Sequence, residues 1–429
     1  MTTDKLYELF LQNGSTVTTD SRNCPKDSLF FALKGDNFNG NQYAPKAIEA
    51  GCAYAIIDDE AYKTCDRCIL VEDALLALQS LARTHRISCG TPIIGITGTN
   101  GKTTTKELIA AVLKEKFKVH FTQGNLNNHI GVPLTLLQLT DEHDIAIIEM
   151  GANHPGEIKL LADIACPNVG IITNVGKAHL EGFGSFEGVQ KTKKELYDFI
   201  GENQGFILRN MDNELLEKMA DDIPVQGYSM VDEQAYVYGT ITNQSGMLQM
   251  RVKCTDETID VNTNLIGGYN AENVLAAVTA GVSFGLSASQ IKHGIENYVP
   301  KNNRSMLVET KANKVVVDAY NANPTSMRAA IENIIASKQT NTVFILGDML
   351  ELGSQSHEEH QNIIALLEQN GQKNVFLVGE HFQKTHSQFP CFANTDALSE
   401  HLCYNPVTNS YILLKGSRGI HLENIMKNL

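Results

Sequence analysis

Short apolar runs alternate with longer helical stretches along most of the chain. The first part carries three apolar runs of strand length and then a helical stretch over residues 73–85. The three runs are residues 29–33, 53–57 and 68–71. This part of the sequence therefore predicts a small domain in which short strands precede a helix.

The middle of the chain has a stronger pattern of buried strands and packed helices. The run TPIIGIT ends at residue 97, and a helix is expected from about residue 103. In that helix Leu108, Ile109, Val112 and Leu113 form the apolar stripe of a helix packed on a sheet. Further strands are expected at 145–150 and 169–175, a β-rich excursion at 223–264 and a helix at 271–284.

The last part repeats the alternation of strands and helices, with apolar runs in KVVVDAY, TVFILGDM, NVFLVG and YILLKG. This alternation indicates a mainly parallel sheet, in which ligand-binding loops follow the carboxyl ends of the strands. Because 429 residues exceed what one core usually organises, we predict three domains with an α/β fold. They are a small α/β domain at 1–86, a central domain with a mainly parallel sheet at 87–305, and a Rossmann-like α/β domain at 306–429.

The clearest chemical motif is GITGTNGKT at residues 95–103, between a predicted strand and a predicted helix. This is the context of a phosphate-binding loop, in which backbone N–H groups and the helix N-terminus face phosphate oxygens. Lys102 would reach the outer phosphates, and the Thr103 hydroxyl suits a Mg²⁺ ligand. The alternative is a glycine turn with an incidental lysine. We expect a P-loop ATPase domain whose nucleotide contacts are Gly98, Thr99, Asn100, Gly101, Lys102, Thr103 and Thr104.

Two later segments have both a structural and a chemical interpretation. Glu149 ends a predicted strand, which would place its carboxylate beside the phosphate loop to hold Mg²⁺. His179 follows another strand, but a single loop histidine is usually a surface residue, and Mg²⁺ prefers oxygen ligands. Three lysines within residues 191–195 favour, from spacing alone, a solvated helix face.

Composition limits the class of protein without indicating a substrate. The 35 basic and 49 acidic residues give a formal charge of −14, which disfavours binding to nucleic acid or an anionic membrane. No secretory signal and no long apolar stretch is visible, so we expect no integral membrane segment. Nine cysteines, an odd number, fit a reducing cytoplasm. The CxxC pair of Cys65 and Cys68 lacks the further ligands that a zinc site needs.

Several motifs occur together in an order that resembles the Mur ligase superfamily. They include GTNGKTT, GNLNN at 124–128, NVGKAHLEGFGS at 174–185 and the segment around Lys193. EMGANHPGEI, DAYNANPTSM, GDMLELG and KGSR resemble the branch of the superfamily that adds a D-alanyl-D-alanine dipeptide. The DNPR motif of the branch that adds the third amino acid does not occur in the sequence.

The resemblance implies roles for residues that spacing alone leaves undecided. It implies that Lys193 is carbamylated and bridges Mg²⁺ through oxygen, with two Mg²⁺ ions held by Thr103, Glu149, His179 and Lys193. Lys102, Lys193 and His179 are then the implied catalytic residues. The other implied nucleotide contacts are Asn270, Asn273, Arg304, Asp318, Tyr320 and Asn321. The implied substrate contacts are Ser21, Arg22, Asn127 and Asn128. At the end of the last predicted strand, Lys415, Ser417 and Arg418 are candidates for the dipeptide site, because positive charge would suit its carboxylate; the alternative is an ordinary strand-to-helix turn.

The activity that the resemblance implies is ATP-dependent ligation in peptidoglycan synthesis, and thereby a part in cell shape and cell division. Its expected substrates are UDP-MurNAc-tripeptide and D-Ala-D-Ala, joined through an acyl phosphate by a monomeric, cytoplasmic enzyme. Two alternatives remain open. One is a folylpolyglutamate-synthase-like ligase, which shares the phosphate loop. The other is a nucleotide switch, a kinase or a paralogue that binds nucleotide without catalysis.

Overall fold

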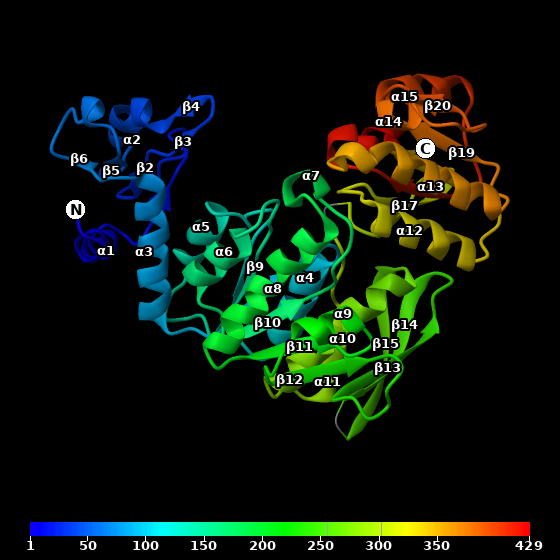
Figure 1. The fold of residues 1–429 in the computed structure, drawn as a ribbon, viewed down its shortest axis with the longest axis horizontal. Coiled ribbons are helices and arrows are strands. Elements are labelled where there is room, and N and C mark those ends of the chain that lie inside the picture. Colours follow the sequence, from blue (N-terminus) through cyan, green and yellow to red (C-terminus); the bar gives the residue numbers. More distant parts are fainter. Residues whose placement is uncertain (255, 302) are drawn as a thin grey trace.

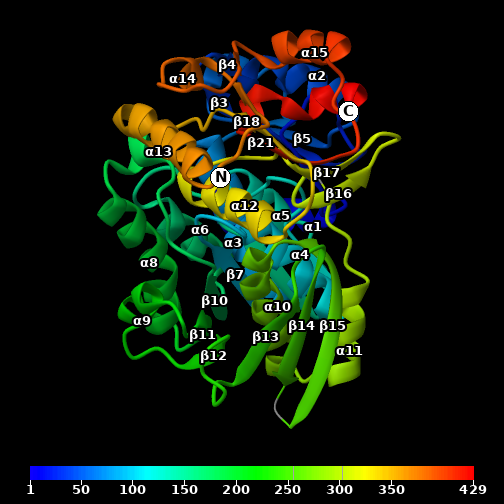
Figure 2. The ribbon, with the colours of Figure 1, turned by 90° about the vertical axis from the view of Figure 1, so that its right-hand side faces the viewer.

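The structure is a computed structural model that describes residues 1–254, 256–301 and 303–429. Sheets of four, nine and six strands follow one another along the chain, and each has its own helices (Figure 1). The N-terminal and C-terminal sheets lie at opposite ends of the molecule in Figure 1, and both stay above the central sheet in the turned view of Figure 2. The predicted α/β protein of three domains is therefore confirmed.

The N-terminal domain is built on a four-stranded parallel sheet. Its elements are α1 (Thr3–Gln12), β1 (Val17–Thr18), β2 (Leu29–Phe31), β3 (Lys34–Gly35), β4 (Phe38–Asn39), α2 (Ala44–Glu49), β5 (Tyr54–Ile57), β6 (Cys68–Leu70) and α3 (Ala74–Cys89). The sheet order is β1-β2-β5-β6, and β3 and β4 form a separate hairpin. Side chains of β2 alternate between faces, so Phe31 packs with α1 and α3 whereas Phe30 packs with α2.

The helix predicted at 73–85 is longer than the sequence indicated. It is α3, which the Asp73 side chain caps by accepting from the Leu76 N–H at 2.8 Å. The helix ends at Gly90, which adopts φ +67°, a left-handed conformation that favours glycine. Leu78 and Leu81 of α3 lie in the same core as helices of the central domain, so α3 connects the first two domains.

The central domain holds the nine-stranded sheet, in the order β15-β14-β13-β12-β11-β10-β7-β9-β8. Its strands are β7 (Ile93–Thr97), β8 (Val119–Phe121), β9 (Ile145–Glu149), β10 (Val169–Ile172), β11 (Phe206–Asn210), β12 (Val225–Ser229), β13 (Val237–Asn243), β14 (Met247–Cys254) and β15 (Glu257–Ile266). Its helices are α4 (Lys102–Leu113), α5 (Gly131–Leu136), α6 (Glu157–Ala165), α7 (Leu180–Phe183), α8 (Phe186–Glu202), α9 (Glu214–Met219), α10 (Ala271–Ser283) and α11 (Ala288–Glu296).

Both faces of the parallel part of this sheet, around β7, β9, β10 and β11, are covered, which explains the nearly continuous apolar character of these strands. Ile94 of β7 and Ile147 of β9 join the core formed with α4, α10 and α11. Their neighbours Ile93 and Ile148 point to the opposite face and pack with α5, α6 and α8. The β-rich excursion expected at 223–264 continues the same sheet: β12 and β13 pair in parallel, and β13, β14 and β15 pair antiparallel.

The C-terminal domain carries the six-stranded sheet in the order β16-β17-β21-β18-β19-β20. Its elements are β16 (Met306–Glu309), β17 (Asn313–Asp318), α12 (Pro324–Ala336), β18 (Thr342–Gly347), the 3₁₀ turn η4 (Gly353–Gln355), α13 (Ser356–Gln369), β19 (Val375–Val378), α14 (Glu380–Gln383), β20 (Cys391–Phe392), α15 (Thr395–Tyr404) and β21 (Ser410–Lys415). The four strands predicted in this part are β17, β18, β19 and β21, and adjacent pairs among them are parallel.

Within the described ranges, none of the helices combines the length and the apolar character that crossing a bilayer requires.

Gly294 of α11 lies against α4, the helix that follows the phosphate loop. A Cβ at this position would lie 2.6 Å from the Val112 Cα and 2.9 Å from the Ala111 carbonyl oxygen. These are backbone atoms that cannot rotate away, so we expect Gly294→Ala to lower the free energy of unfolding by about 1–3 kcal/mol. Urea denaturation followed by circular dichroism measures the loss. The control is Gly246→Ala, whose Cβ would meet nothing within 4 Å; equal stability of the two variants would contradict this packing.

Candidate functional site

A cavity of about 860 Å³ lies between the central and C-terminal domains. Its walls include the loops at the carboxyl ends of β7, β9 and β10 in one domain and of β17 in the other. In both sheets, the carboxyl ends of the strands face this cavity. Parallel sheets bind their ligands at this edge. The predicted residues that line it are Thr99, Asn100, Gly101, Lys102, Thr103, Thr104, Asn127, Asn128, Glu149, His179, Asn270, Asn273, Arg304, Asp318, Tyr320, Asn321 and Lys415.

The phosphate loop is held in shape by contacts within the protein. Gly98 has φ +145°, and a Cβ there would lie 2.0 Å from the Thr173 Oγ1, so only glycine fits this position. Lys102 Nζ donates to the carbonyl oxygens of Gly98 at 2.8 Å and Thr99 at 3.2 Å. The loop and α4 therefore have the form of an anion site, with the lysine folded over the loop.

The carboxylate of Glu149 is almost completely enclosed, with its side chain 2% exposed. It accepts hydrogen bonds from Thr103 Oγ1 at 3.0 Å and Asn127 Nδ2 at 2.8 Å, and Lys106 Nζ lies 3.3 Å from it. Burial alone would raise the pKa of Glu149, but the charges of Lys106 and Lys102 and the Asn127 hydrogen bond outweigh burial and hold it below its usual value. Glu149 is therefore an anion at neutral pH.

The donors around Glu149 fit a Mg²⁺ ion that is shared with phosphate groups. Thr103 and Glu149 both offer oxygen, the ligand that Mg²⁺ prefers. Across residues 1–254, 256–301 and 303–429, no group of three or more His, Cys, Asp or Glu side chains is arranged to hold a metal ion. The chain thus supplies part of a coordination shell, and Mg²⁺ commonly takes the rest from substrate phosphates and water.

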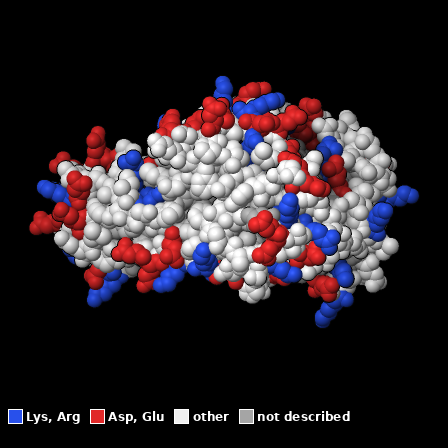
Figure 3. Space-filling view, turned by 90° about the horizontal axis from the view of Figure 1, so that it is seen from below, with Lys and Arg blue, Asp and Glu red and all other residues white. Residues whose placement is uncertain are grey.

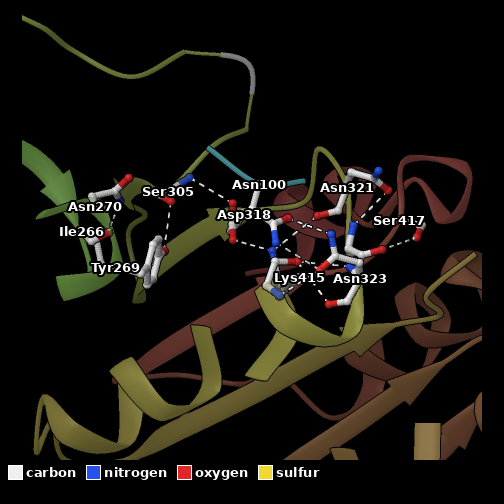
Figure 4. Close-up of polar contacts among 12 residues, drawn as sticks. Asn100, Ile266, Tyr269, Asn270, Ser305, Asp318, Asn321, Asn323, Lys415 and Ser417 are labelled. Carbon is white, nitrogen blue, oxygen red and sulfur yellow. Dashed lines mark hydrogen bonds and ion pairs between the residues drawn. The ribbon is translucent and has the colours of Figure 1, made fainter. Parts of the chain in front are cut away.

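The predicted asparagine pair forms one hydrogen-bonded unit at the start of α10. Asn273 Nδ2 donates to Asn270 Oδ1 at 2.8 Å. Asn270 Nδ2 in turn donates to the Ile266 carbonyl oxygen at 2.8 Å (Figure 4). Thr105 of α4 donates to Asn273 Oδ1 at 3.0 Å. These contacts tie α10 to the helix of the phosphate loop, which fixes the distance between the asparagines and the loop.

Asp318 and Lys415 end adjacent strands of the C-terminal sheet and form a nearly buried ion pair. Their Oδ2 and Nζ atoms are 2.6 Å apart, and Lys415 Nζ also donates to the Asn321 carbonyl oxygen at 3.3 Å (Figure 4). The backbone N–H of Ser305 donates to Asp318 Oδ1 at 3.3 Å. Lys415 is therefore already neutralised by Asp318.

Tyr320 has two guanidinium groups against its ring. Arg304 lies 3.5 Å from the ring centroid, and Arg418 lies 5.4 Å from it. Arg304 Nε is buried and has no hydrogen-bond partner in the described part of the chain, so a donor in the cavity wall is left for a ligand.

Among the described residues, three pairs of polar side chains join the two domains beside the cavity. They are Asn323 Nδ2 with Asn100 Oδ1 at 2.7 Å (Figure 4), Lys177 Nζ with Glu359 Oε1 at 2.9 Å, and His179 Nδ1 with Glu351 Oε2 at 2.6 Å. Asn323 is also the N-cap of α12, so the phosphate loop contacts the start of a helix in the other domain. The docked C-terminal domain therefore contacts the phosphate loop directly.

Lys193 points into the protein, unlike its neighbours on α8. Its exposed fraction is 3%, whereas Lys191 is exposed and Lys194 pairs with Asp221 at 2.6 Å. Burial, and after it the charge of Lys102, lowers the pKa of Lys193 to about 7. Its Nζ lies 5.8 Å from the centroid of the Phe183 ring. The solvated helix face that spacing favoured is therefore wrong for Lys193 and correct for Lys191.

The remaining predicted residues lie outside the main cavity or have other partners. Ser417 and Arg418 line a neighbouring depression of about 230 Å³ that Tyr320 also borders. Ser21 and Arg22 line neither space, and Arg22 pairs with Asp20 at the surface of the N-terminal domain. Asn128 borders the main cavity, but its Oδ1 accepts from the backbone N–H groups of Ile130 and Gly131.

Three residues whose contacts are described above were given no role from the sequence. Lys106 lies one turn after Lys102 within the buried stripe of α4, and a charge in such a stripe was the signal that could have revealed it. Asn323 and Glu351 lie within the motifs DAYNANPTSM and GDMLELG, but their contacts cross an interface between domains, so no local pattern indicated the partner of either residue.

Charges on the outer surface differ from those in the cavity. On the face shown in Figure 3, acidic and basic side chains are interspersed around broad uncharged areas, and no continuous basic surface forms there among the described residues.

Comparison with known protein families places the chain in a class. Residues 15–86 match the model described as Mur ligase family, catalytic domain; residues 96–281 match the Mur ligase middle domain; and residues 303–418 match the Mur ligase, glutamate ligase domain. Together these matches cover most of the sequence, and the chain belongs to the Mur ligase family.

Within that family the chain is similar to ligases that add D-alanyl-D-alanine. It is 34% identical to the UDP-N-acetylmuramoyl-tripeptide–D-alanyl-D-alanine ligase of Bacillus subtilis, over 99% of this chain and 94% of the relative. A crystal structure of MurF from Acinetobacter baumannii superposes with a TM-score of 0.87 at 29% identity, covering 98% of this chain and 97% of that one. MurF ligase from Thermotoga maritima, solved in complex with ADP, gives a TM-score of 0.87 at 26% identity, covering 96% of each chain.

The buried pair of Lys106 and Glu149 predicts a large effect on stability. Lys106→Met leaves a buried carboxylate without its cation, so the free energy of unfolding should fall by about 3–5 kcal/mol. The double variant Lys106→Met/Glu149→Gln should regain much of that loss, because no unpaired charge remains. Lys114→Met is the control, since Lys114 ends the same helix in solvent. Denaturation curves measure all three variants, and equal stability of Lys106→Met and Lys114→Met would contradict the ion pair.

Proposed function

We propose that the chain is an ATP-dependent ligase that joins D-alanyl-D-alanine to UDP-MurNAc-tripeptide, yielding UDP-MurNAc-pentapeptide, ADP and phosphate. The observation that carries the proposal is the single cavity that unites the phosphate loop and Glu149 of one domain with Asp318, Tyr320 and Lys415 of the other. The family membership and the similarity along nearly the whole chain to ligases of this name support it. Such an activity belongs to peptidoglycan synthesis, and through it to cell shape, the cell cycle and cell division.

The first step forms an acyl phosphate. A carboxylate oxygen of the tripeptide attacks the γ-phosphorus of ATP; the new O–P bond replaces the bond to ADP, which leaves. Charge spreads over the transferring oxygens in this step. Lys102 donates to the carbonyl oxygens of Gly98 and Thr99, which holds its ammonium group beside the loop, where its positive charge can offset part of that negative charge.

The second step forms the amide. The free amine of the dipeptide attacks the activated carbonyl carbon, the C–N bond forms, the C–O bond to phosphate breaks, and the amine gives up a proton. Water would hydrolyse the acyl phosphate, so the site must exclude it. The contact of Asn323 with Asn100 brings the C-terminal domain onto the phosphate loop, which supports a closed site during this step.

The nucleotide contacts extend from the loop into the C-terminal domain. We propose that the amides of Asn270 and Asn273 hold the adenine, and that Asp318 accepts from a ribose hydroxyl. The unpartnered Nε of Arg304 is suited to a phosphate or ribose oxygen. Tyr320 and Asn321 border the same part of the cavity and would lie beside ribose and base.

Metal binding rests on Thr103 and Glu149 at one position, and on His179 and Lys193 at a second. A bound Mg²⁺ would neutralise phosphate charge and orient the transferring group. A cationic lysine cannot be a ligand, so Lys193 must first react. Its neutral amine would attack the carbon of CO₂, forming an N–C bond and losing a proton, which leaves a carbamate with two oxygen donors. Burial and the pKa of about 7 support this reaction, because the amine is then substantially neutral at neutral pH.

For the remaining substrates the structure favours some candidates over others. Arg418 is exposed and borders the depression beside Tyr320, so its charge is available to the dipeptide carboxylate, with Ser417 next to it. Lys415 is paired with Asp318, so it would contribute to the dipeptide site through this ion pair and not as a free cation. Ser21 and Arg22 are proposed to bind the uridine diphosphate, and Asn127 and Asn128 the peptide side.

We keep 1–86, 87–305 and 306–429 as the proposed domain limits, with α3 spanning the first junction. A cytoplasmic location is supported by nine cysteines in the sequence. The single chain brings the described cavity together without a second copy, which supports a monomer.

A coupled assay tests the reaction. Phosphate release from ATP is expected with UDP-MurNAc-tripeptide and D-Ala-D-Ala together, and it should fall to background when the dipeptide is omitted. Release without the dipeptide would indicate a different acceptor or a simple ATPase. Release with a folate and glutamate instead would favour the folylpolyglutamate-synthase-like alternative.

Lys193→Ala tests the carbamate. Loss of that group removes charge from the site of phosphoryl transfer, so kcat should fall by roughly 10²–10³-fold. Formate or acetate that enters the space left by the side chain should restore part of the rate. Lys194→Ala, which removes the neighbouring ion-paired lysine, should keep its rate and show no rescue. Wild-type activity in Lys193→Ala, or equal rescue of both variants, would show that the assignment is wrong.

A further inference from the structure

Glu351 of the C-terminal domain contacts a candidate metal ligand of the central domain. Its Oε2 lies 2.6 Å from Nδ1 of His179, and both residues border the main cavity. Of the three polar pairs that join the domains beside the cavity, this one alone includes a residue proposed to hold metal. The contact can therefore influence a metal ligand as well as hold two domains together.

A histidine can offer a metal only one ring nitrogen while the other makes a hydrogen bond. Here Nδ1–H donates to Glu351, so Nε2 is the nitrogen left with its lone pair for a ligand. Carboxylate, histidine and metal in series are a recurring arrangement in which the carboxylate fixes the tautomer and the ring orientation. The geometry at His179 matches the first two members of that series.

The backbone around both residues is shaped to bring them together. His179 has φ +50° and Glu351 has φ +66°, left-handed conformations that cost energy for residues with a Cβ. α7, which begins directly after His179, packs against η4, which begins two residues after Glu351. In that packing the Glu181 Cβ would lie 3.6 Å from a Cβ on Gly353. The pair of His179 and Glu351 therefore lies where two loops pack against each other.

Phe183 links this pair to the other proposed ligand of the second metal position. The ring of His179 meets the Phe183 ring edge-on, with centroids 6.4 Å apart, and Lys193 Nζ lies 5.8 Å from the same ring. The aromatic side chain therefore lies beside both groups. Orientation of the His179 ring by Glu351 would set Nε2 relative to Lys193.

We propose that Glu351 is a positioning residue that the C-terminal domain supplies to the metal site of the central domain. By accepting from Nδ1, it directs Nε2 of His179 toward the metal position that a carbamate on Lys193 would share. This inference rests on the proposed function of His179 and Lys193 and adds that the second metal position is complete only when the C-terminal domain is docked. The first ion, at Thr103 and Glu149, does not depend on Glu351.

The competing explanation is an interdomain ion pair without a role in metal binding. The pair of Lys177 and Glu359 provides the matched case, because it joins the same two domains at 2.9 Å and does not touch His179. Glu351→Ala removes the pair with His179, and Glu359→Gln removes the negative charge from the other pair, although its amide oxygen can still accept from Lys177. The Glu351 side chain is 56% exposed, so its truncation should leave the fold intact, which thermal unfolding checks.

The test is a Mn²⁺ titration of the full-length, nucleotide-free enzyme in bicarbonate buffer, followed by electron paramagnetic resonance. Wild type should show the nitrogen coupling of a coordinated imidazole, and His179→Ala should lack it. Glu351→Ala should weaken Mn²⁺ binding by about 10–100-fold and diminish the nitrogen coupling. Glu359→Gln should match wild type in both measurements.

Equal weakening in Glu351→Ala and Glu359→Gln would overturn the proposal, because both pairs would then act only through docking. Unchanged affinity and coupling in Glu351→Ala would overturn it as well, and so would an absence of nitrogen coupling in wild type. None of these readouts depends on turnover, so the proposal and the ligase activity can fail separately.

Discussion

The arrangement of the rest of the site depends on the buried carboxylate of Glu149. A charge removed from water is tolerated only when other groups compensate it, and here the compensation comes from separate elements. The register of β7 and β9 places Glu149 opposite Ile96, directly before the phosphate loop. Thr103 and Lys106 then reach it from successive turns of α4, and Asn127 reaches it from the loop after β8. The anion therefore fixes how the loop, the helix and the sheet edge lie relative to one another.

From this anchored loop the site extends into a second domain. The C-terminal sheet contributes Asp318 and Lys415 at the ends of adjacent strands, and α12 contributes Asn323 at its N-terminus. Asn100 contacts Asn323, so the loop that would hold phosphates also contacts the docked C-terminal domain. A reaction with a water-sensitive intermediate requires such an arrangement, since the cavity is complete only when two domains meet.

The local parts of this account could be predicted from the sequence. The strands and helices around the phosphate loop follow apolar periodicity, and the chemistry of Lys102 and Thr103 follows from the loop motif. The position of residues 223–264 was harder to predict, because alternating runs indicate strands but not the sheet that the strands join. In the structure these strands extend the central sheet. For Lys193 spacing alone favoured solvent, whereas the resemblance to a family implied a carbamate that bridges Mg²⁺; the structure buries the side chain. Glu351 and Asn323 depend on the docking of domains, which no local pattern encodes.

The central claim is that the two domains hold an acyl phosphate formed from the carboxyl group of the precursor. Labelling the terminal carboxylate of UDP-MurNAc-tripeptide with ¹⁸O tests this most directly, since the attacking oxygen must leave with the phosphate. With ATP and D-Ala-D-Ala present, mass spectrometry of the released phosphate should find one ¹⁸O atom for each amide bond formed. Amide formation with unlabelled phosphate would contradict the account.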